Sequence, residues 1–485
     1  MKSQFFEYST EYFKEPQIHS SEADQPGSVE FTKREWRRNR NEGIIAETQP
    51  QKELALANKW SNVYTTLENN TQPRIIKFTQ FENYLICTDE KDNVSTFDWN
   101  LSHKNDDFNY MDYINGNSNS INKNSRNVNT NGYNSRYSSE LISLFSNGNP
   151  LGTKITDVGF LNEDDIPLLM IGTSDGIVKI YKNFYSVDEC QLISAWRALP
   201  DMILAPRSIG LISEWQQSRG SLLVTGDAKV IKIWDAPREK CLGDIPIRST
   251  SAITSLTSDQ VSGDIIVGGF YDGSIRVYDR RKAAEDSMVM EWKNTSNSGP
   301  SYLNRTGFNL ASSIKNVHMQ RGGIRELISG SADGFVKLWD IRYRDPVLEF
   351  RPFNKTSMTT ALIHEHAPVI ACASKEINVY STKGSLVDVI KGQGHSILHN
   401  QIHGLGNSVV GSKNNSSSGG KGGVSGVGAG VSSITSGVVN SLTYGGSSSN
   451  SYVNALALHP HRMMMASNYN QSKQINIYRC LETNQ

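Results

Sequence analysis

Seven short segments of the chain share one pattern of apolar and polar positions. Each has a β-branched residue, any residue, a second aliphatic or β-branched residue, and then an aromatic residue. The segments end at Phe97, Tyr181, Trp234, Tyr278, Trp339, Tyr380 and Tyr478. In the copy "SIRVYD", the apolar Ile275 and Val277 alternate with Arg276 and Tyr278. A period of two residues is typical of a β-strand, so the pattern predicts seven strands of one kind.

The residues before each segment predict a hairpin. Asp272-Gly273 precedes "SIRVYD" and suits a tight turn, and the apolar run "DIIVGGF" lies upstream of it. The same order recurs in "LLMIGTSDGIVKIY", "SLLVTGDAKVIKIW" and "ELISGSADGFVKLW". One such unit cannot bury both faces of its sheet, whereas units placed around an axis cover one another. The fixed order argues against a β-sandwich and predicts an all-β, seven-bladed WD-repeat propeller.

The length of 485 residues leaves room for additions to the ring. Seven blades need roughly 300 residues. We therefore expect an N-terminal arm over residues 1–60 and a propeller over 61–485, interrupted by two insertions. The first insertion, about 101–149, is rich in Asn and Ser, and the second, about 404–451, is rich in Gly and Ser. Such sequences bury too little apolar surface to order themselves, so both are predicted to be disordered loops.

The arm contains good helix formers, and Thr32 with Glu35 has the spacing of a capping box. Gly43 and Pro50 are expected to interrupt it, which predicts one or two short helices. The segment 62–68 is a candidate outer strand. It could join the last blade and close the ring, which would remove exposed sheet edges.

Composition narrows the class of partner. Lys plus Arg and Asp plus Glu both number 49, so the net charge gives no sign of nucleic-acid binding. The five cysteines show no C-x-x-C spacing and are expected to be buried free thiols in a reducing compartment. No apolar run is long enough to span a membrane, and the first residues lack a signal-peptide core. These features predict an intracellular, soluble protein without direct membrane insertion.

Two segments are candidate partner-binding elements. The arm carries a basic run with a tryptophan in its middle; the residues we single out are Trp36, Arg37, Arg38 and Arg40. Glutamates interrupt the run, which favours a solvated helix face or a protein contact over lipid or RNA. Trp36 would anchor the helix to the ring or to a partner. The second segment is the loop "PDMILAPR", with Met202, Ile203, Leu204 and Arg207 as candidates. Its alternative role is packing onto the blade beneath it.

Other motifs offer weaker alternatives. Arg280-Arg281 lacks the flanking hydrophobe and glycine of phosphoinositide-binding propellers, and "WDIR" at 339–342 resembles a motif of cullin-ligase substrate receptors. Two histidine pairs, "HEH" (His364, His366) and "HPH" (His459, His461), could each share a strand face, but a third metal ligand is not indicated. The sequence has no P-loop or nucleophile elbow. We therefore expect no catalytic residues, metal or cofactor.

Several longer motifs carry a more specific resemblance. "AWRALPDM", "GDAKVIKIWD", "DIPIRSTSAITSL" and "DGSIRVYDRR" resemble the C-terminal propeller of raptor, the scaffold subunit of TOR kinase complex 1. "STEYFKEPQ" and "KREWRRNRNE" resemble the segment before that propeller, and "NALALHPHRMMMASNYN" resembles its last blade. The two insertions look like fungal elaborations.

The resemblance implies a non-catalytic scaffold in nutrient-responsive growth signalling. Its implied partners are TOR kinase, the other subunits of the complex, and protein substrates or regulators. Its implied location is the cytoplasm, with recruitment to the vacuolar or lysosomal surface. Raptor proteins also carry a caspase-like domain and a helical solenoid ahead of the propeller. This sequence lacks both, so Met1 is either a true start or a boundary within a longer scaffold. The competing function is a substrate receptor of a cullin-type ubiquitin ligase.

Overall fold

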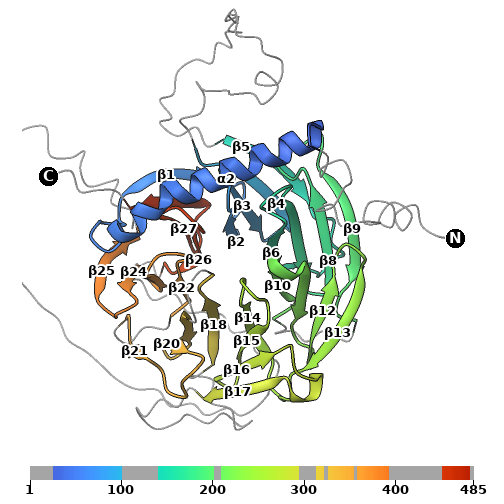
Figure 1. Ribbon diagram of the computed structural model, residues 1–485. Helices are drawn as coiled ribbons and strands as arrows, with labels where there is room; N and C mark the ends of the chain where they lie inside the picture. The colour runs from blue at the N-terminus through green and yellow to red at the C-terminus, as the bar shows by residue number, and fades with distance from the viewer. Residues whose placement is uncertain are drawn as a thin grey trace, which may run out of the picture. The chain divides into compact units, whose positions relative to one another are not determined.

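The protein forms a ring of seven four-stranded antiparallel sheets, crossed by one long helix (Figure 1). All of the described residues belong to one compact unit. The computed structural model describes residues 26–100, 140–200, 202, 209–293, 313–321, 326–353, 358–392 and 451–480. The predicted seven-bladed propeller is confirmed.

Each blade contributes one strand to the centre of the ring, one to its rim and two between them. The innermost strands, which contact one another between neighbouring blades, are β2 (Pro73–Phe78), β6 (Ile155–Leu161), β10 (Ile212–Gln216), β14 (Ile253–Ser258), β18 (Ile314–Met319), β22 (Thr360–Ile363) and β26 (Val453–Leu458). The second strands are β3 (Tyr84–Asp89), β7 (Leu168–Thr173), β11 (Ser221–Thr225), β15 (Ile265–Phe270), β19 (Glu326–Ser331), β23 (Val369–Ala373) and β27 (Met464–Tyr469).

The third strands are the seven aromatic-ended segments of the sequence pattern. They are β4 (Asn93–Asp98), β8 (Ile177–Lys182), β12 (Val230–Asp235), β16 (Ser274–Asp279), β20 (Val336–Asp340), β24 (Glu376–Ser381) and β28 (Gln474–Arg479). The outer strands are β5 (Glu140–Ser146), β9 (Gln191–Arg197), β13 (Lys240–Pro246), β17 (Met288–Lys293), β21 (Leu348–Phe350), β25 (Leu386–Lys391) and β1 (Val63–Glu68).

Local sequence explains the packing of a typical blade. Gly273 has a φ of +84° in the turn between β15 and β16, a conformation that costs glycine little. A Cβ atom at Gly269 would lie 2.6 Å from Cγ2 of Ile314 in the next blade, so this small residue permits close contact between sheets. Val277 and Leu327, from these two neighbouring blades, are buried in the core between them. Each fully buried side chain of this size contributes about 1.5–3 kcal/mol.

The ring is closed by a strand from the beginning of the chain. β1 pairs with β28, so the last blade combines residues 63–68 with residues 453–479. Leu67 of β1 is fully buried with Ile477 of β28 in the core between the last and the first blade. The prediction that segment 62–68 joins the last blade is confirmed. Closure leaves no unpaired edge between the two ends of the ring.

The arm forms one helix, α2 (Val29–Leu54), of 26 residues. Ser28, and not Thr32, is its N-cap, and the Ser28 hydroxyl accepts a hydrogen bond from the backbone N–H of Phe31 (3.1 Å). The expected interruption at Gly43 and Pro50 is wrong, since both residues lie inside the helix. Each weakens a helix in isolation, but the contacts of α2 with the ring offset that cost.

The boundary of the first predicted insertion also needs correction. Residues 140–146 form the outer strand β5 of the first blade, where Phe145 packs on Tyr181 with ring centroids 4.9 Å apart. Residues 101–139 and 404–450 lie outside the described residues, so the predicted disorder there stays a prediction. Within the described part of the chain, no helix combines the length and apolar character needed to span a bilayer.

Candidate interaction surface

Three polar side chains on one side of α2 bind the ring. Arg37 Nη2 lies 2.6 Å from the carboxylate of Asp165, and Arg40 Nη2 lies 2.8 Å from that of Glu82. The Asn41 amide donates to the backbone carbonyl of Asp164 (3.0 Å). Asp164, Asp165 and Glu82 lie in loops between the first and second strands of the first two blades. We call a loop at this position the first loop of its blade. Figure 1 shows α2 crossing this part of the ring.

The connection after α2 is fixed to the ring as well. Trp60 is fully buried, and its indole N–H donates to the carbonyl of Ala55 (2.9 Å). One carboxylate oxygen of Asp388, in β25 of the sixth blade, accepts the backbone N–H groups of Trp60 and Ser61, each at 2.8 Å. A carboxylate that accepts two backbone donors makes charge-assisted bonds, which are stronger than neutral ones. The arm is therefore attached to the propeller at both ends.

The structure divides the basic run between two sides of the helix. Arg37 and Arg40 bind the ring, whereas Arg38 pairs with Glu42 one turn later (3.0 Å) and remains mostly exposed. Trp36 is 41% exposed and stacks under the Arg40 guanidinium, 5.3 Å from the ring centroid. A large aromatic side chain with this exposure is suited to a protein contact. Trp36 and Arg38 are accessible to a partner, while Arg37 and Arg40 position the helix.

The second predicted segment falls mostly outside the described residues. Ile203, Leu204 and Arg207 belong to the undescribed range 203–208, and their role stays a prediction. Met202 is half-buried and packs against the core that contains Leu199. For this one residue, packing onto the blade is observed.

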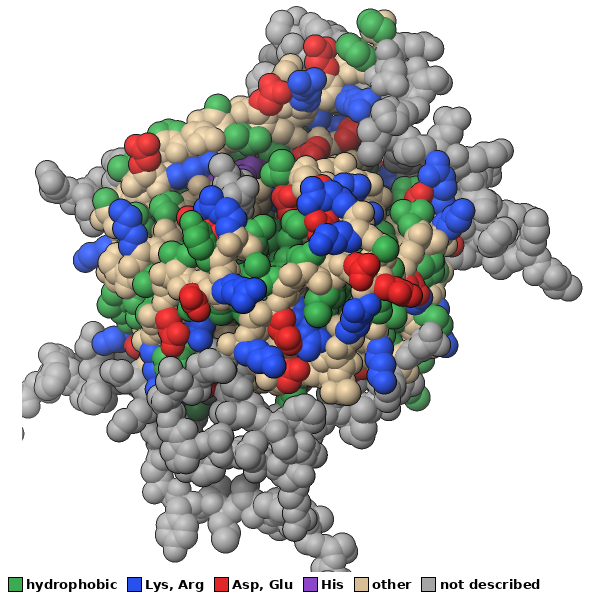
Figure 2. Space-filling model, turned by 60° about the horizontal axis from the view of Figure 1, so that its bottom comes forward, with side chains coloured by type: hydrophobic (Ala, Val, Ile, Leu, Met, Phe, Trp, Pro, Cys, Tyr) green, Lys and Arg blue, Asp and Glu red, His purple; other side chains and the backbone are tan. Residues whose placement is uncertain are grey.

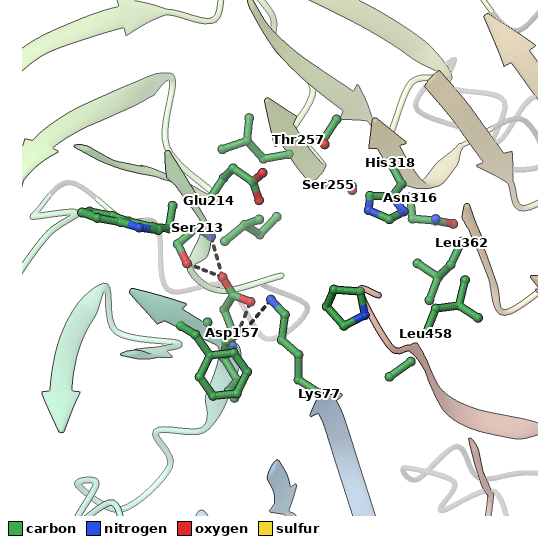
Figure 3. A pocket seen from close by; sticks show the side chains of 18 of the residues that line it. Lys77, Asp157, Ser213, Glu214, Ser255, Thr257, Asn316, His318, Leu362 and Leu458 are labelled. Atoms are coloured by element: carbon green, nitrogen blue, oxygen red, sulfur yellow. Dashed lines mark hydrogen bonds between the residues drawn. The ribbon is translucent and has the colours of Figure 1, made fainter. Parts of the chain in front are cut away.

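A channel of about 710 Å³ runs through the centre of the ring (Figure 3). Its walls come from the innermost strands, and they carry charged and polar side chains. Asp157 accepts hydrogen bonds from the backbone N–H (2.6 Å) and the hydroxyl (2.5 Å) of Ser213 in the next blade. Lys77 donates to the carbonyl of Val158 (3.0 Å). These contacts join the first three blades across the channel wall.

Three glutamates of the channel differ in their proton affinity. Burial raises the pKa of Glu163 and of Glu214 to about 7, against a usual value of 4.5. Burial acts in the same direction on Glu365, but the hydrogen bond and charge of His318 and the charge of Arg321 prevail and lower its pKa to about 2. The channel thus holds carboxyl groups that are partly protonated near neutral pH beside one that stays ionised.

The histidine pairs lie in first loops and not on strand faces as expected. His366 of the sixth blade stacks on His461 of the seventh, with ring centroids 4.8 Å apart. Burial lowers the pKa of His366 to about 4 and that of His461 to about 3, so both rings are neutral at pH 7. Gln80 of the first blade lies 2.9 Å from His461 Nε2. The histidines therefore join blades; among the described residues, no cluster of His, Cys, Asp or Glu suits a metal ion.

The arginines of the "DRR" and "WDIR" motifs contact other side chains of the propeller. Arg281 pairs with Asp279 (2.6 Å), and Arg342 pairs with Asp340. Arg280 instead donates to the side chain of Gln216, the last residue of β10 in the third blade (2.5 Å). The two arginines of the "DRR" sequence thus do not form one phosphate-binding pair. On the face seen in Figure 2, acidic and basic side chains are interspersed, in keeping with equal numbers of each.

Comparisons with known proteins agree with this geometry. A family profile described as "WD domain, G-beta repeat" matches residues 312–340. The chain is 41% identical over 490 residues to "Target of rapamycin complex 1 subunit KOG1" of Saccharomyces cerevisiae, covering 99% of this chain and 26% of that protein. It is 38% identical over 393 residues to "Target of rapamycin complex 1 subunit mip1" of Schizosaccharomyces pombe, covering 81% and 26%.

A solved structure is similar as well. The chain superimposes on "Crystal structure of Chaetomium thermophilum Raptor" with a TM-score of 0.64 and 31% sequence identity, covering 99% of this chain and 32% of that one. The chain therefore spans about a quarter of the two yeast proteins and about a third of the solved one. The family resemblance carried by the sequence motifs is confirmed.

Proposed function

We propose that this chain, whose propeller is of the raptor type, is a non-catalytic scaffold of TOR complex 1 that positions substrates and regulators in nutrient-responsive growth signalling. The observation that carries the proposal is the 41% identity to a complex 1 subunit across 99% of the chain. The names of the relatives reported above refer to the TOR complex and not to a cullin ligase. The ligase alternative rests on "WDIR", where Arg342 is paired with its own Asp340.

The mechanism follows from the way the arm is held. A ring of seven blades, closed by β1, presents its loops in fixed relative positions. Because α2 is attached at both ends, the exposed Trp36 and Arg38 are displayed on a rigid helix. Modest contacts there and at the loop around Met202 would add up once the propeller is tethered within a complex.

The proposal includes a location. A scaffold of TOR signalling would work in the cytoplasm and be recruited to the vacuolar or lysosomal surface by its protein partners. Microscopy of the tagged chain under nutrient-rich and starved conditions would show a vacuolar rim signal that depends on TOR complex subunits.

Affinity capture of the tagged full chain tests the function. We expect co-purification of TOR kinase and its lethal-with-Sec-thirteen-like partner, weakened in a Trp36→Ala, Arg38→Ala variant. Arg344→Ala, on an exposed arginine of another blade, is the matched control and should leave capture unchanged. Recovery of a cullin and its adaptor that is lost in Arg342→Ala would support the ligase function and refute the scaffold proposal.

A further inference from the structure

A small pocket of about 140 Å³ lies between α2 and the last blade, apart from the central channel. Gln51 of α2 forms one wall, and Tyr64 of β1 and Trp99 form others. Arg462, from the first loop of the last blade, and Arg479, from the end of β28, also line it. Three distant stretches of the sequence, 51–64, 99–100 and 462–479, thus meet in one polar recess.

The two arginines of this pocket have no acidic partner within contact distance. Arg462 lies over the ring of Trp99 (5.5 Å to the centroid), and Arg479 lies over the ring of Tyr64 (5.9 Å). Among the described residues, no carboxylate lies within 4.0 Å of either guanidinium, and no acceptor is hydrogen-bonded to one. Arg37, by contrast, has the carboxylate of Asp165 at 2.6 Å. Two cations that line one pocket with no anion in contact repel each other.

Electrostatics and a second unsatisfied donor agree with this geometry. Burial lowers the pKa of Arg462, Glu47 of α2 opposes that effect, and the charge of Arg479 adds to it. Trp99 is only 2% exposed, and its indole N–H has no acceptor in the described part of the chain. A buried donor without an acceptor costs about 1–3 kcal/mol. The lining therefore offers two guanidinium groups that have no acceptor among the described residues, beside a buried indole N–H that also lacks one.

We propose that this pocket binds the phosphoryl group of a phosphorylated side chain on a partner protein. A phosphorylated side chain carries a charge of about −1.5 to −2 at neutral pH, which matches two arginines better than the single charge of a carboxylate. Guanidinium groups bind phosphate oxygens through paired N–H donors. This inference goes beyond the scaffold role and does not depend on it.

A protein partner fits the surroundings better than an anionic membrane. The pocket is recessed beside α2, and α2 carries the exposed carboxylates Glu42, Glu47 and Glu53. A flat bilayer with negative headgroups would be repelled by these carboxylates over a wide area, whereas a single phosphorylated side chain has only to reach the recess.

Titration calorimetry on the full chain tests the proposal. The probe is an uncharged Gly/Ser peptide that carries one phosphoserine, compared with the same peptide carrying serine or glutamate at that position. We expect saturable binding of the phosphopeptide only, weakened about tenfold or more by Arg462→Gln and by Arg479→Gln. Arg344→Gln is the matched control and should bind as the unmodified chain does.

One variant distinguishes the loss of a binding site from the loss of folding. Glu47→Gln removes the carboxylate that acts on Arg462 and should tighten phosphopeptide binding a few-fold, a gain that an unfolded protein cannot show. Equal binding of the glutamate peptide, unchanged binding by both arginine variants, or absence of phosphopeptide binding would overturn the proposal. So would binding to phosphoinositide-containing vesicles but not to the phosphopeptide, an outcome that would assign the pocket to a lipid headgroup.

Discussion

Removal of the Arg37–Asp165 ion pair should loosen the N-terminal part of α2 from the ring without unfolding the ring. Arg37→Ala takes away the guanidinium, and Asp165→Asn takes away only the charge of its partner. Asp165 lies in the first loop of the second blade and Arg37 lies on the ring-facing side of α2, so either change acts on the junction between them. The pair is therefore a direct handle on the position of the arm.

The expected magnitude follows from the burial of the pair. The side chains of Arg37 and Asp165 are 20% and 18% exposed, and their nearest nitrogen and oxygen lie 2.6 Å apart. Exposed pairs contribute about 0.2–1 kcal/mol, and loss of one partner of a fully buried pair costs about 3–5 kcal/mol. A pair that is one-fifth exposed should lie between these limits, at about 1–2 kcal/mol. This corresponds to a five- to thirtyfold increase in local opening of the helix.

Hydrogen exchange measured by mass spectrometry can resolve this effect. Amides of α2 between residues 31 and 44 should exchange five- to thirtyfold faster in both variants, while amides of β15 and β23 keep their protection. The control is Arg38→Ala, because Arg38 and Glu42 are 78% and 63% exposed and should change exchange by less than about twofold. Equal acceleration in the Arg37 and Arg38 variants would refute the assignment of Arg37 to the ring-facing side.

Three further predictions concern the ring. Leu67→Ala in the closing strand should lower the free energy of unfolding, measured in urea, by about 2–5 kcal/mol. Val63→Ala, at a residue of the same strand that is 44% exposed, should change it by less than about 1 kcal/mol. Equal effects would contradict closure by β1. Gly176→Ala should cost about 2–3 kcal/mol in the same assay, because φ is +84° and a Cβ would collide with the Leu199 carbonyl. The raised pKa values of Glu163 and Glu214 mean that the folded protein binds more protons than the unfolded chain does, so their contribution to stability is greatest below pH 4.5 and is lost as the pH rises through 7. The stability of the double Gln variant relative to the unmodified chain should therefore be roughly 1–3 kcal/mol higher at pH 8 than at pH 5. Thermal unfolding at several pH values measures this difference, and the opposite trend would show that the sign is wrong.

The sequence predicted the ring because the pattern that defines each blade is local. The alternation around Ile275 and Val277 and the turn at Gly273 lie within a few residues of one another. The strand β5 was missed because it follows a long Asn- and Ser-rich stretch, although "ELISLF" itself has the composition of a strand. The continuity of α2 through Gly43 and Pro50 depends on contacts with the ring, which propensity cannot show.

Only part of the candidate surface was predicted, because its contacts join residues that are far apart in the sequence. Trp36 and the arginines around it stand out in the sequence. Which of them face the ring depends on where the helix docks, and the docking partners Glu82 and Asp165 lie far away in the sequence. The pocket of Arg462 and Arg479 has no local signature at all. Its walls come from α2, β1, the first blade and the last blade, and they meet only because the ring closes on itself.

The first loops explain why the arm is held against the ring and is not a mere connection. Glu82 and Asp165, in the first two blades, bind α2; His461 and Arg462, in the last blade, contribute the histidine stack and the arginine pocket. A blade keeps its fold when a first loop changes, because its core lies between the sheets. These loops nevertheless carry polar groups that meet across blades and against one helix. The physical consequence is that α2 links the two places: Arg40, which lies over Trp36, binds Glu82 of the first blade, and Gln51 of the same helix lines the arginine pocket at the last blade.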